Sequence, residues 1–399
     1  MSKQVQDAYI VAATRTPIGK SHKGYLRNMR PDDLLATTMK AVLAQAPGLD
    51  PQAIEDVVCG CAIPEAQQGL NVARIAAVLA GLPVGVGGVT VNRFCASGLT
   101  ALQMAADRIR VGEADVMIAA GVESMSMVPM MGNTPSLSPS IFEREGDVGI
   151  AYGMGLTAEK VAQRWKVSRD AQDAFALQSH QRALAAQQAG DFTAEITPIT
   201  VTDRGFDLLK GEALSQSRTV ELDEGPRPDT SIEGLAKLRT VFAARGSVTA
   251  GNSSQTSDGA GALLVVSEAA LKRFNLRPLA RFVSYASKGV PPEIMGIGPI
   301  EAIPVALRHA GLSLQDMDWI ELNEAFAAQS LAVIEQLGMD PSKVNPMGGA
   351  IALGHPLGAT GAIRAATVVH ALQRKKLKYG MVTMCVGMGQ GAAGILERV

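Results

Sequence analysis

The chain has little cysteine, no excess of charge of either sign and no long apolar run, and each shortage excludes a class of protein. Four cysteines among 399 residues do not make a disulfide framework, so free thiols in a reducing compartment are expected. Basic residues number 37 against 38 acidic ones and cluster only in short runs such as Arg374-Lys375-Lys376. Nucleic acid is therefore not an expected partner. No apolar run reaches the length of a membrane span, so none is expected.

We expect no targeting signal at either end. The strand-like segment Ala8 to Ala13 begins too early to leave room for a signal or transit peptide, and Glu397-Arg398-Val399 is no peroxisomal tripeptide. A hydrophobic content of 47% with 19% charged residues is typical of a globular enzyme. We expect a soluble, cytoplasmic protein of two or three packed domains.

Apolar strand-like runs alternate with helical patterns, which predicts an α/β fold, and the pattern occurs twice. The first series is 56–61, 91–92, 96–98 and 116–121. The second, roughly 260 residues later, is 318–323, 344–345, 359–361 and 381–385. The second copy carries an extra loop that contains His355. Two similar halves would bring their strand–helix junctions together about a pseudo-twofold axis, so we expect the functional site where the halves meet.

A segment of different character separates the halves. Residues 126–246 begin rich in Met, Pro and Ser and continue with amphipathic helices expected over 157–165 and 169–188, the latter capped by Ser168. Turns and a Pro-rich passage follow from Gly190. We predict an N-terminal half over 1–125 completed by 247–275, an inserted loop domain over 126–246, and a C-terminal half over 276–399.

Three residues in this pattern suggest covalent chemistry. Cys95 lies where a strand-like run gives way to a helix, and unpaired N–H groups at a helix start favour a thiolate, so a lowered thiol pKa is expected. His355 lies in a Gly-rich loop, and Cys385 ends a strand before another glycine turn. A free cysteine is more often a small buried hydrophobic residue, and a lone histidine more often a core residue. Together, however, the three suggest acyl transfer through a thioester.

Four motifs in order, at full-length spacing, resemble those of the thiolase family. They are Asn92-Arg93-Phe94-Cys95-Ala96-Ser97-Gly98-Leu99, Asn323-Glu324-Ala325-Phe326-Ala327, Gly348 to Gly358 around His355, and Cys385-Val386-Gly387-Met388-Gly389. The resemblance implies the thiolase fold: two similar five-layered α/β/α/β/α halves related by a pseudo-twofold axis, plus a loop domain that covers the coenzyme A site. It also implies a homodimer or homotetramer.

The resemblance also assigns the catalytic roles. Cys95 would be the nucleophile that carries the acyl group, His355 its base, and Cys385 the acid and base that moves the proton of the leaving enolate and of the incoming thiol. Asn323 would hold a water at the first oxyanion site with His355, and the N–H groups of Cys95 and Gly387 would form the second. Glu324, beside Asn323, is interpreted as a positioning residue.

The substrate contacts also follow from the resemblance. Ser254 would contact the pantetheine of coenzyme A, Arg227 the adenine nucleotide, and Met154 the acyl group. Ser254 and Arg227 could instead be ordinary loop residues. Coenzyme A is expected as substrate, with no permanently bound cofactor. No metal is expected, because the Cys59-Gly60-Cys61 spacing is too short and no second pair follows.

The residue at position 153 indicates which reaction of the family to expect. Biosynthetic acetoacetyl-CoA thiolases carry a histidine where this chain has Gly153, and the missing imidazole leaves space for longer acyl chains. We therefore expect a degradative 3-ketoacyl-CoA thiolase (an acetyl-CoA C-acyltransferase) of fatty-acid β-oxidation, with a multienzyme β-oxidation partner left open. The alternatives are the Claisen condensation of two acetyl-CoA and a non-catalytic acyl-CoA-binding relative. A ketoacyl synthase fits less well, since its site uses two histidines where this chain has Asn323 and His355.

Overall fold

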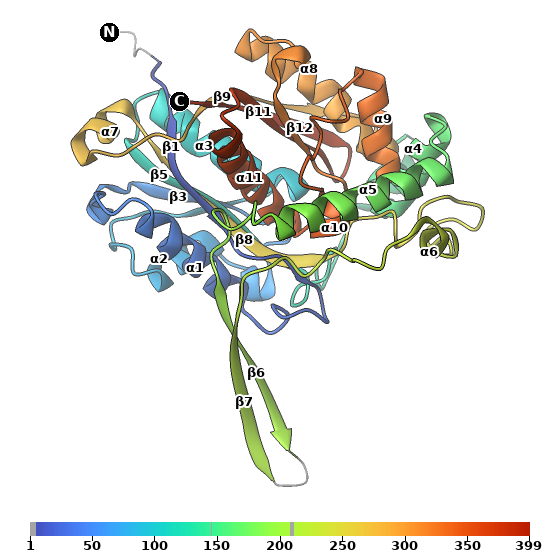
Figure 1. Ribbon diagram of the computed structural model, residues 1–399, viewed down its shortest axis with the longest axis horizontal. Coiled ribbons are helices and arrows are strands. Elements are labelled where there is room, and N and C mark those ends of the chain that lie inside the picture. The colour runs from blue at the N-terminus through green and yellow to red at the C-terminus, as the bar shows by residue number, and fades with distance from the viewer. Residues whose placement is uncertain (1–4, 145, 208–210) are drawn as a thin grey trace.

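The computed structural model describes residues 5–144, 146–207 and 211–399, and a large sheet runs through its centre (Figure 1). The strands of this sheet are β1 (Tyr9–Arg15), β2 (Gly19–Lys20), β3 (Asp56–Gly60), β4 (Val89–Val91), β5 (Val116–Ser124), β8 (Ser257–Val266), β9 (Ala280–Gly289), β10 (Trp319–Leu322), β11 (Tyr379–Val386) and β12 (Gln390–Arg398). Their order is β10–β11–β12–β9–β1–β8–β5–β3–β4, with β2 beside β8. Strands β1 and β9 join the two halves through the pairs Tyr9–Arg281 and Ile10–Ala280.

Helices cover both outer faces and fill the space between the halves. They are α1 (Pro31–Ala44), α2 (Val72–Leu79), α3 (Ser97–Arg110), α7 (Glu268–Phe274), α8 (Gly298–Ala310), α9 (Ala327–Leu337), α10 (Ala350–Leu353) and α11 (Thr360–Lys375). One buried cluster joins α1 and α2 to the first half of the sheet, and another joins α8 and α9 to the second half. Helices α3 and α11 lie between the two halves, which gives the five layers expected from the resemblance.

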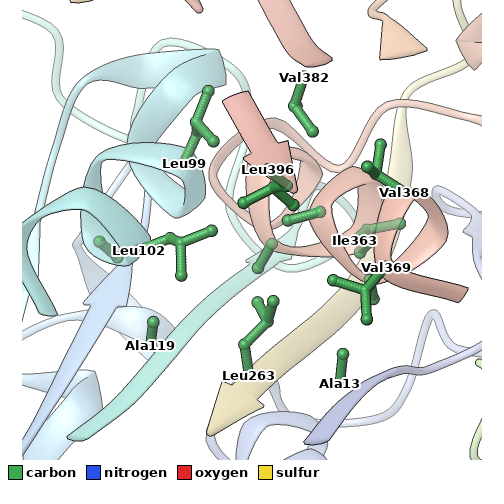
Figure 2. Close-up of a cluster of buried hydrophobic side chains, with 14 of the residues drawn as sticks. Ala13, Leu99, Leu102, Ala119, Leu263, Ile363, Val368, Val369, Val382 and Leu396 are labelled. Atoms are coloured by element: carbon green, nitrogen blue, oxygen red, sulfur yellow. The ribbon is translucent and has the colours of Figure 1, made fainter. Parts of the chain in front are cut away.

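The central layer packs closely because glycine faces glycine. A β-carbon on Gly98 would lie 2.6 Å from the backbone nitrogen of Ala362, and one on Gly361 only 2.1 Å from that of Leu99. Around this crossing, Leu99 and Leu102 of α3 meet side chains of α11 and of both half-sheets (Figure 2). The starts of α3 and α11 therefore lie next to each other, as the duplication requires.

Strand pairing repeats in the two halves and confirms the duplication. Strand β3 pairs parallel to β5, and β10 pairs parallel to β11. Strand β8 then runs antiparallel to β5, as β12 does to β11. In the second half, Val344 forms a parallel bridge to Ile320. This bridge is at the position where β4 pairs with β3 in the first half. The extra loop of the second copy contains the short helix α10 and leads to His355.

The insertion between β5 and β8 contains α4 (Met154–Arg164), α5 (Arg169–Gln188), β6 (Ile199–Asp207), β7 (Glu212–Val220) and α6 (Ile232–Ala236). Helix α5 has the predicted bounds, and the Ser168 hydroxyl accepts the predicted cap bond from the N–H of Ala171 at 3.2 Å. The division of the chain at residues 125, 246 and 275 stays a prediction. No helix in the described ranges has the length and apolar character that crossing a membrane requires.

The expectation of turns beyond Gly190 is wrong for 199–207 and 212–220. Strands β6 and β7 pair over their whole length as an antiparallel hairpin that projects from the body of the molecule (Figure 1). The first eight residues of β7 are exposed. With solvent on both faces, the strand needs no apolar alternation, so the sequence carries no period-two signal that would mark it.

Candidate active site

Cys95 lies in a short 3-10 turn, Phe94–Ala96, that leads directly into α3. Its residue is 7% exposed, so little water reaches the thiol. The backbone N–H groups of Gly387 and of Cys95 itself are placed to stabilise the anionic sulfur. Gly387 follows β11 and would bring a β-carbon to 3.3 Å from the Phe94 ring, so its backbone approaches the turn closely. The structure thus brings together Cys95 and Gly387 from opposite halves.

The expected lowering of the Cys95 pKa is wrong. Burial raises the pKa of the thiol to about 12, and the N–H groups of Gly387 and Cys95 offset only part of this rise. At this site, the free-energy cost of removing a thiolate from water exceeds the stabilisation that the N–H groups at the helix start provide. Cys95 therefore rests as a thiol, and its activation needs a base that takes the proton as the bond to substrate forms.

His355 has the properties of that base. It lies in a loop, 5% exposed, and its backbone forms a parallel bridge with Thr256. Its Nδ1 lies 2.6 Å from the Thr360 hydroxyl oxygen, and its Nε2 lies 3.3 Å from Asn323 Nδ2. An amide nitrogen only donates, so the lone pair of Nε2 accepts from Asn323 and Nδ1–H donates to Thr360. Burial, helped by the charge of Arg364, lowers the pKa of His355 to about 3, which keeps the imidazole neutral.

Asn323 connects His355 to β11. Its backbone N–H donates to the Thr383 carbonyl at 2.9 Å, and its side-chain oxygen is buried with no hydrogen-bond partner among the described residues. A buried acceptor without a partner costs free energy unless a water or ligand donates to it. This free oxygen fits the predicted water. The neighbouring Glu324 accepts bonds from Ser179, Asn345 and Ile351, contacts typical of the positioning role expected for it.

Cys385 is fully buried on β11, within an apolar cluster. Burial raises the pKa of its thiol, and the charge of the nearby Cys95 adds to the rise. The cluster consists of Ala158, Val248, Met295, Ala325 and Phe326, with Met154 packed against it. The predicted acyl-contacting residue Met154 thus packs against the cluster that contains Cys385, and the thiols of Cys95 and Cys385 are close enough to influence each other.

A cleft of about 250 Å³ lies on the loop-domain side of the site. Arg227 lines it, together with Gly251 and Gln255. Ser254 does not line it, although its neighbour Gln255 does; its N–H donates to the Ala325 carbonyl at 2.9 Å. The structure therefore places Arg227 at a cleft, and Ser254 between that cleft and the apolar cluster. The roles of all these residues stay predictions.

Sequence reasoning missed two contacts of the site. Thr360, which fixes the orientation of His355, appears in the repeated helix-start pattern, but that pattern gives no reason to assign it a role. His180 lines the cleft and accepts the backbone N–H of Arg227 at 3.2 Å. Burial lowers the pKa of His180 to about 4. No local motif marks His180, because it lies on α5 between ordinary helix residues.

Comparison with known proteins agrees with this architecture. The family model described as thiolase, N-terminal domain, matches residues 8–269, and that described as thiolase, C-terminal domain, matches residues 276–398. A 3-ketoacyl-CoA thiolase of Bacillus subtilis is 49% identical over 98% of this chain and 100% of its own length. An acetyl-CoA acetyltransferase of Pseudomonas aeruginosa is 46% identical over 99% of this chain and 100% of its own length.

Solved structures agree as well. Human mitochondrial 3-ketoacyl-CoA thiolase matches with a TM-score of 0.89 at 40% identity, covering 99% of both chains. The dimeric peroxisomal thiolase of Saccharomyces cerevisiae matches with a TM-score of 0.88 at 40% identity, covering 99% of this chain and 98% of that one. The chain belongs to the thiolase family and has its fold. It is an acyltransferase.

Proposed function

We propose that this acyltransferase cleaves 3-ketoacyl-CoA with coenzyme A, through an acyl group carried on Cys95, in fatty-acid β-oxidation. The observation that carries the proposal is the meeting of Cys95 with Gly387 and Cys385 from the other half, together with a neutral His355 that contacts Asn323 and directly precedes the turn packed against Cys95. A buried thiol with a neutral base and a second thiol matches what this cleavage requires.

In the proposed first half-reaction, His355 Nε2 takes the proton of Cys95 as its sulfur attacks the 3-keto carbon. The bond between carbons 2 and 3 then breaks, and the Cys385 thiol protonates carbon 2 of the departing enolate to give acetyl-CoA. Water held by Asn323, with His355, stabilises the enolate oxygen. The N–H groups of Cys95 and Gly387 stabilise the oxygen of the acyl group under attack.

In the second half-reaction, the Cys385 thiolate takes the proton of the incoming coenzyme A thiol. The resulting sulfur attacks the acyl group on Cys95, the bond to Cys95 breaks, and His355 returns the proton to its sulfur. Coenzyme A is thus a substrate, and the proposed steps use no metal and no permanently bound cofactor. Arg227 would contact its nucleotide, Ser254 its pantetheine and Met154 the acyl chain.

The acyl-enzyme is tested directly by intact-mass analysis. Incubation of the folded protein with a 3-ketoacyl-CoA, without free coenzyme A, is expected to add one acyl group, and peptide mapping to place it on Cys95. Addition of coenzyme A is expected to remove it, because thiolysis regenerates the thiol. A folded protein that gains no mass would contradict the catalytic proposal and favour a non-catalytic acyl-CoA-binding relative.

The degradative direction rests on the space at Gly153, where an added β-carbon would meet no atom within 4 Å. The adjacent Met154 packs against the cluster around Cys385. We expect Gly153→His to lower kcat/KM for a 3-ketodecanoyl substrate about tenfold relative to acetoacetyl-CoA, since one badly placed side chain costs about 1–3 kcal/mol of discrimination. Gly153→Ala is the matched control and should keep the wild-type ratio. A wild type that strongly prefers acetoacetyl-CoA would support the condensation of two acetyl-CoA instead.

The cellular setting remains part of the proposal. We place the protein in the cytoplasm as a homodimer or homotetramer. The yeast relative is described as dimeric, which supports self-association here. A β-oxidation multienzyme partner would suit the proposed cleavage, because the 3-ketoacyl-CoA must come from an oxidation step.

A further inference from the structure

Glu123, near the end of β5, is a buried carboxylate that the proposed reaction does not use. Its Oε2 accepts the backbone N–H of Gly358 at 2.8 Å and that of Ala62 at 2.7 Å. Its Oε1 accepts the N–H of Ile63 at 3.3 Å and the side-chain amide of Gln68. The Cys61 thiol also lies 3.8 Å from Oε1. Burial raises the pKa of Glu123, but its four N–H donors cannot accept a proton in return, so they oppose this rise and favour the carboxylate.

The bond from Gly358 to Glu123 crosses from one half of the molecule to the other. Gly358 lies in the 3-10 turn Leu357–Ala359, between His355 and its partner Thr360. A β-carbon on Gly358 would lie 2.7 Å from Glu123 Oε2 and 2.5 Å from the nitrogen of Ala62, so only glycine fits this close approach. Glu123 therefore anchors, to the first half, the turn that orients the imidazole.

The duplication gives this anchor a counterpart in the active site. Gly121 pairs with the last residue of β3, and Thr383 pairs with the last residue of β10, so these two residues occupy equivalent positions. Two residues further along each strand lie Glu123 and Cys385. Glu123 is therefore the pseudo-twofold equivalent of Cys385, the predicted proton carrier.

The facing helix starts correspond in the same way. The pattern Cys95-Ala96-Ser97-Gly98 before and within α3 repeats as Gly358-Ala359-Thr360-Gly361 at α11. One pair of junctions thus places two thiols together, and the related pair places a glycine N–H against a carboxylate. The pair of Cys95 and Cys385 is predicted to be reactive. In the pair of Gly358 and Glu123, the glycine N–H instead donates a hydrogen bond to the carboxylate.

We propose that Glu123 is a positioning residue for the reaction: its carboxylate fills the pseudo-twofold counterpart of the active site and holds the turn that orients His355. The inference rests on the proposed thiolase reaction, because it is measured through turnover. The charge of Glu123 also acts on Cys95, whose sulfur is near enough to be affected by it. Glu123 does not touch the reacting atoms and acts through Gly358 and the imidazole.

The test is Glu123→Gln, which keeps the shape but turns an amide N–H₂ toward N–H donors. We expect kcat for 3-ketoacyl-CoA cleavage to fall at least about 30-fold, while KM for both substrates stays within about threefold, because the base is misplaced but the coenzyme A cleft is intact. Glu123→Asp keeps the charge but has a shorter side chain, so it is expected to recover only part of the lost kcat and to stay at least about threefold below wild type. A purely structural role would not produce this split or this recovery.

Glu195→Gln is the matched control, since Glu195 is an equally buried carboxylate that accepts bonds from Arg15 at 2.6 Å and Thr367 at 2.9 Å, both outside the His355 turn. Its kcat should stay within about threefold of wild type. A Glu123→Gln variant with kcat within threefold of wild type, or with the same loss as Glu195→Gln, would overturn the inference. If Glu123→Gln does not fold, Glu123→Asp decides: at least a threefold loss of kcat at unchanged KM supports the inference, and wild-type kcat overturns it. An inactive wild type would instead contradict the proposed function.

Discussion

Replacing Cys95 by alanine is expected to lower kcat for 3-ketoacyl-CoA cleavage at least about 10⁴-fold, because the acyl group then has no atom to bind. The same variant should gain no acyl mass when incubated with substrate. Coenzyme A binding should be retained, since the cleft lined by Arg227 and His180 does not include Cys95. Steady-state kinetics and intact-mass analysis measure the two effects separately.

Two other cysteines provide the comparison. Cys385→Ala is expected to reduce turnover about 10²- to 10⁴-fold, as for loss of a general acid or base, yet still to form the Cys95 adduct slowly. Cys59→Ala should leave kcat within about threefold, because Cys59 is fully buried in the outer cluster with α1 and α2. An acyl adduct on Cys385 in the Cys95→Ala variant would contradict the division of roles between the two thiols.

Replacing Arg15 by alanine is expected to lower the free energy of unfolding by about 3–5 kcal/mol, the cost of leaving a buried charge without its partner. Arg15 Nε donates to Glu195 at 2.6 Å, and its two terminal nitrogens donate to Asp223 at 2.7 and 2.9 Å. Arg15 is 1% exposed. Burial opposes its charge, but Asp223 and Glu195 outweigh burial and raise the pKa of the guanidinium. The network ties the insertion to β1.

Urea denaturation monitored by circular dichroism measures this loss, with Arg30→Ala as the control. Arg30 forms an ion pair with Asp32 at 2.7 Å, but its side chain is 52% exposed. Solvent screens that pair, so its loss should cost less than about 1 kcal/mol. Equal stability of the two variants would show that the buried network does not hold the insertion in place.

Local sequence was enough for much of the fold. The start of α5 follows from Ser168, whose cap bond needs only its own neighbours. The duplication was visible because both halves repeat the same order of strand, helix start, helix and strand. The β6–β7 hairpin was missed because a strand exposed on both faces carries no apolar period.

The candidate site was also predicted only in part from the sequence. The resemblance of four motifs to those of the thiolase family pointed to Cys95, His355, Cys385 and Asn323, and the structure places His355 Nε2 3.3 Å from Asn323 Nδ2. The partner of His355 on its other ring nitrogen, Thr360, needed the fold of the turn between them. Glu123 had no motif at all, because its donors come from three separate segments and meet only when the halves pack.

The sequence by itself determined which residues could react and in what order the strands and helices of each half follow. Those properties depend on side-chain chemistry and on short-range periodicity. Only the tertiary structure decided the state in which the residues rest: Cys95 as a thiol rather than a thiolate, and His355 as a neutral base. The physical reason is burial, since the cost of removing a charge from water depends on all the atoms around it, and these come from both halves of the molecule.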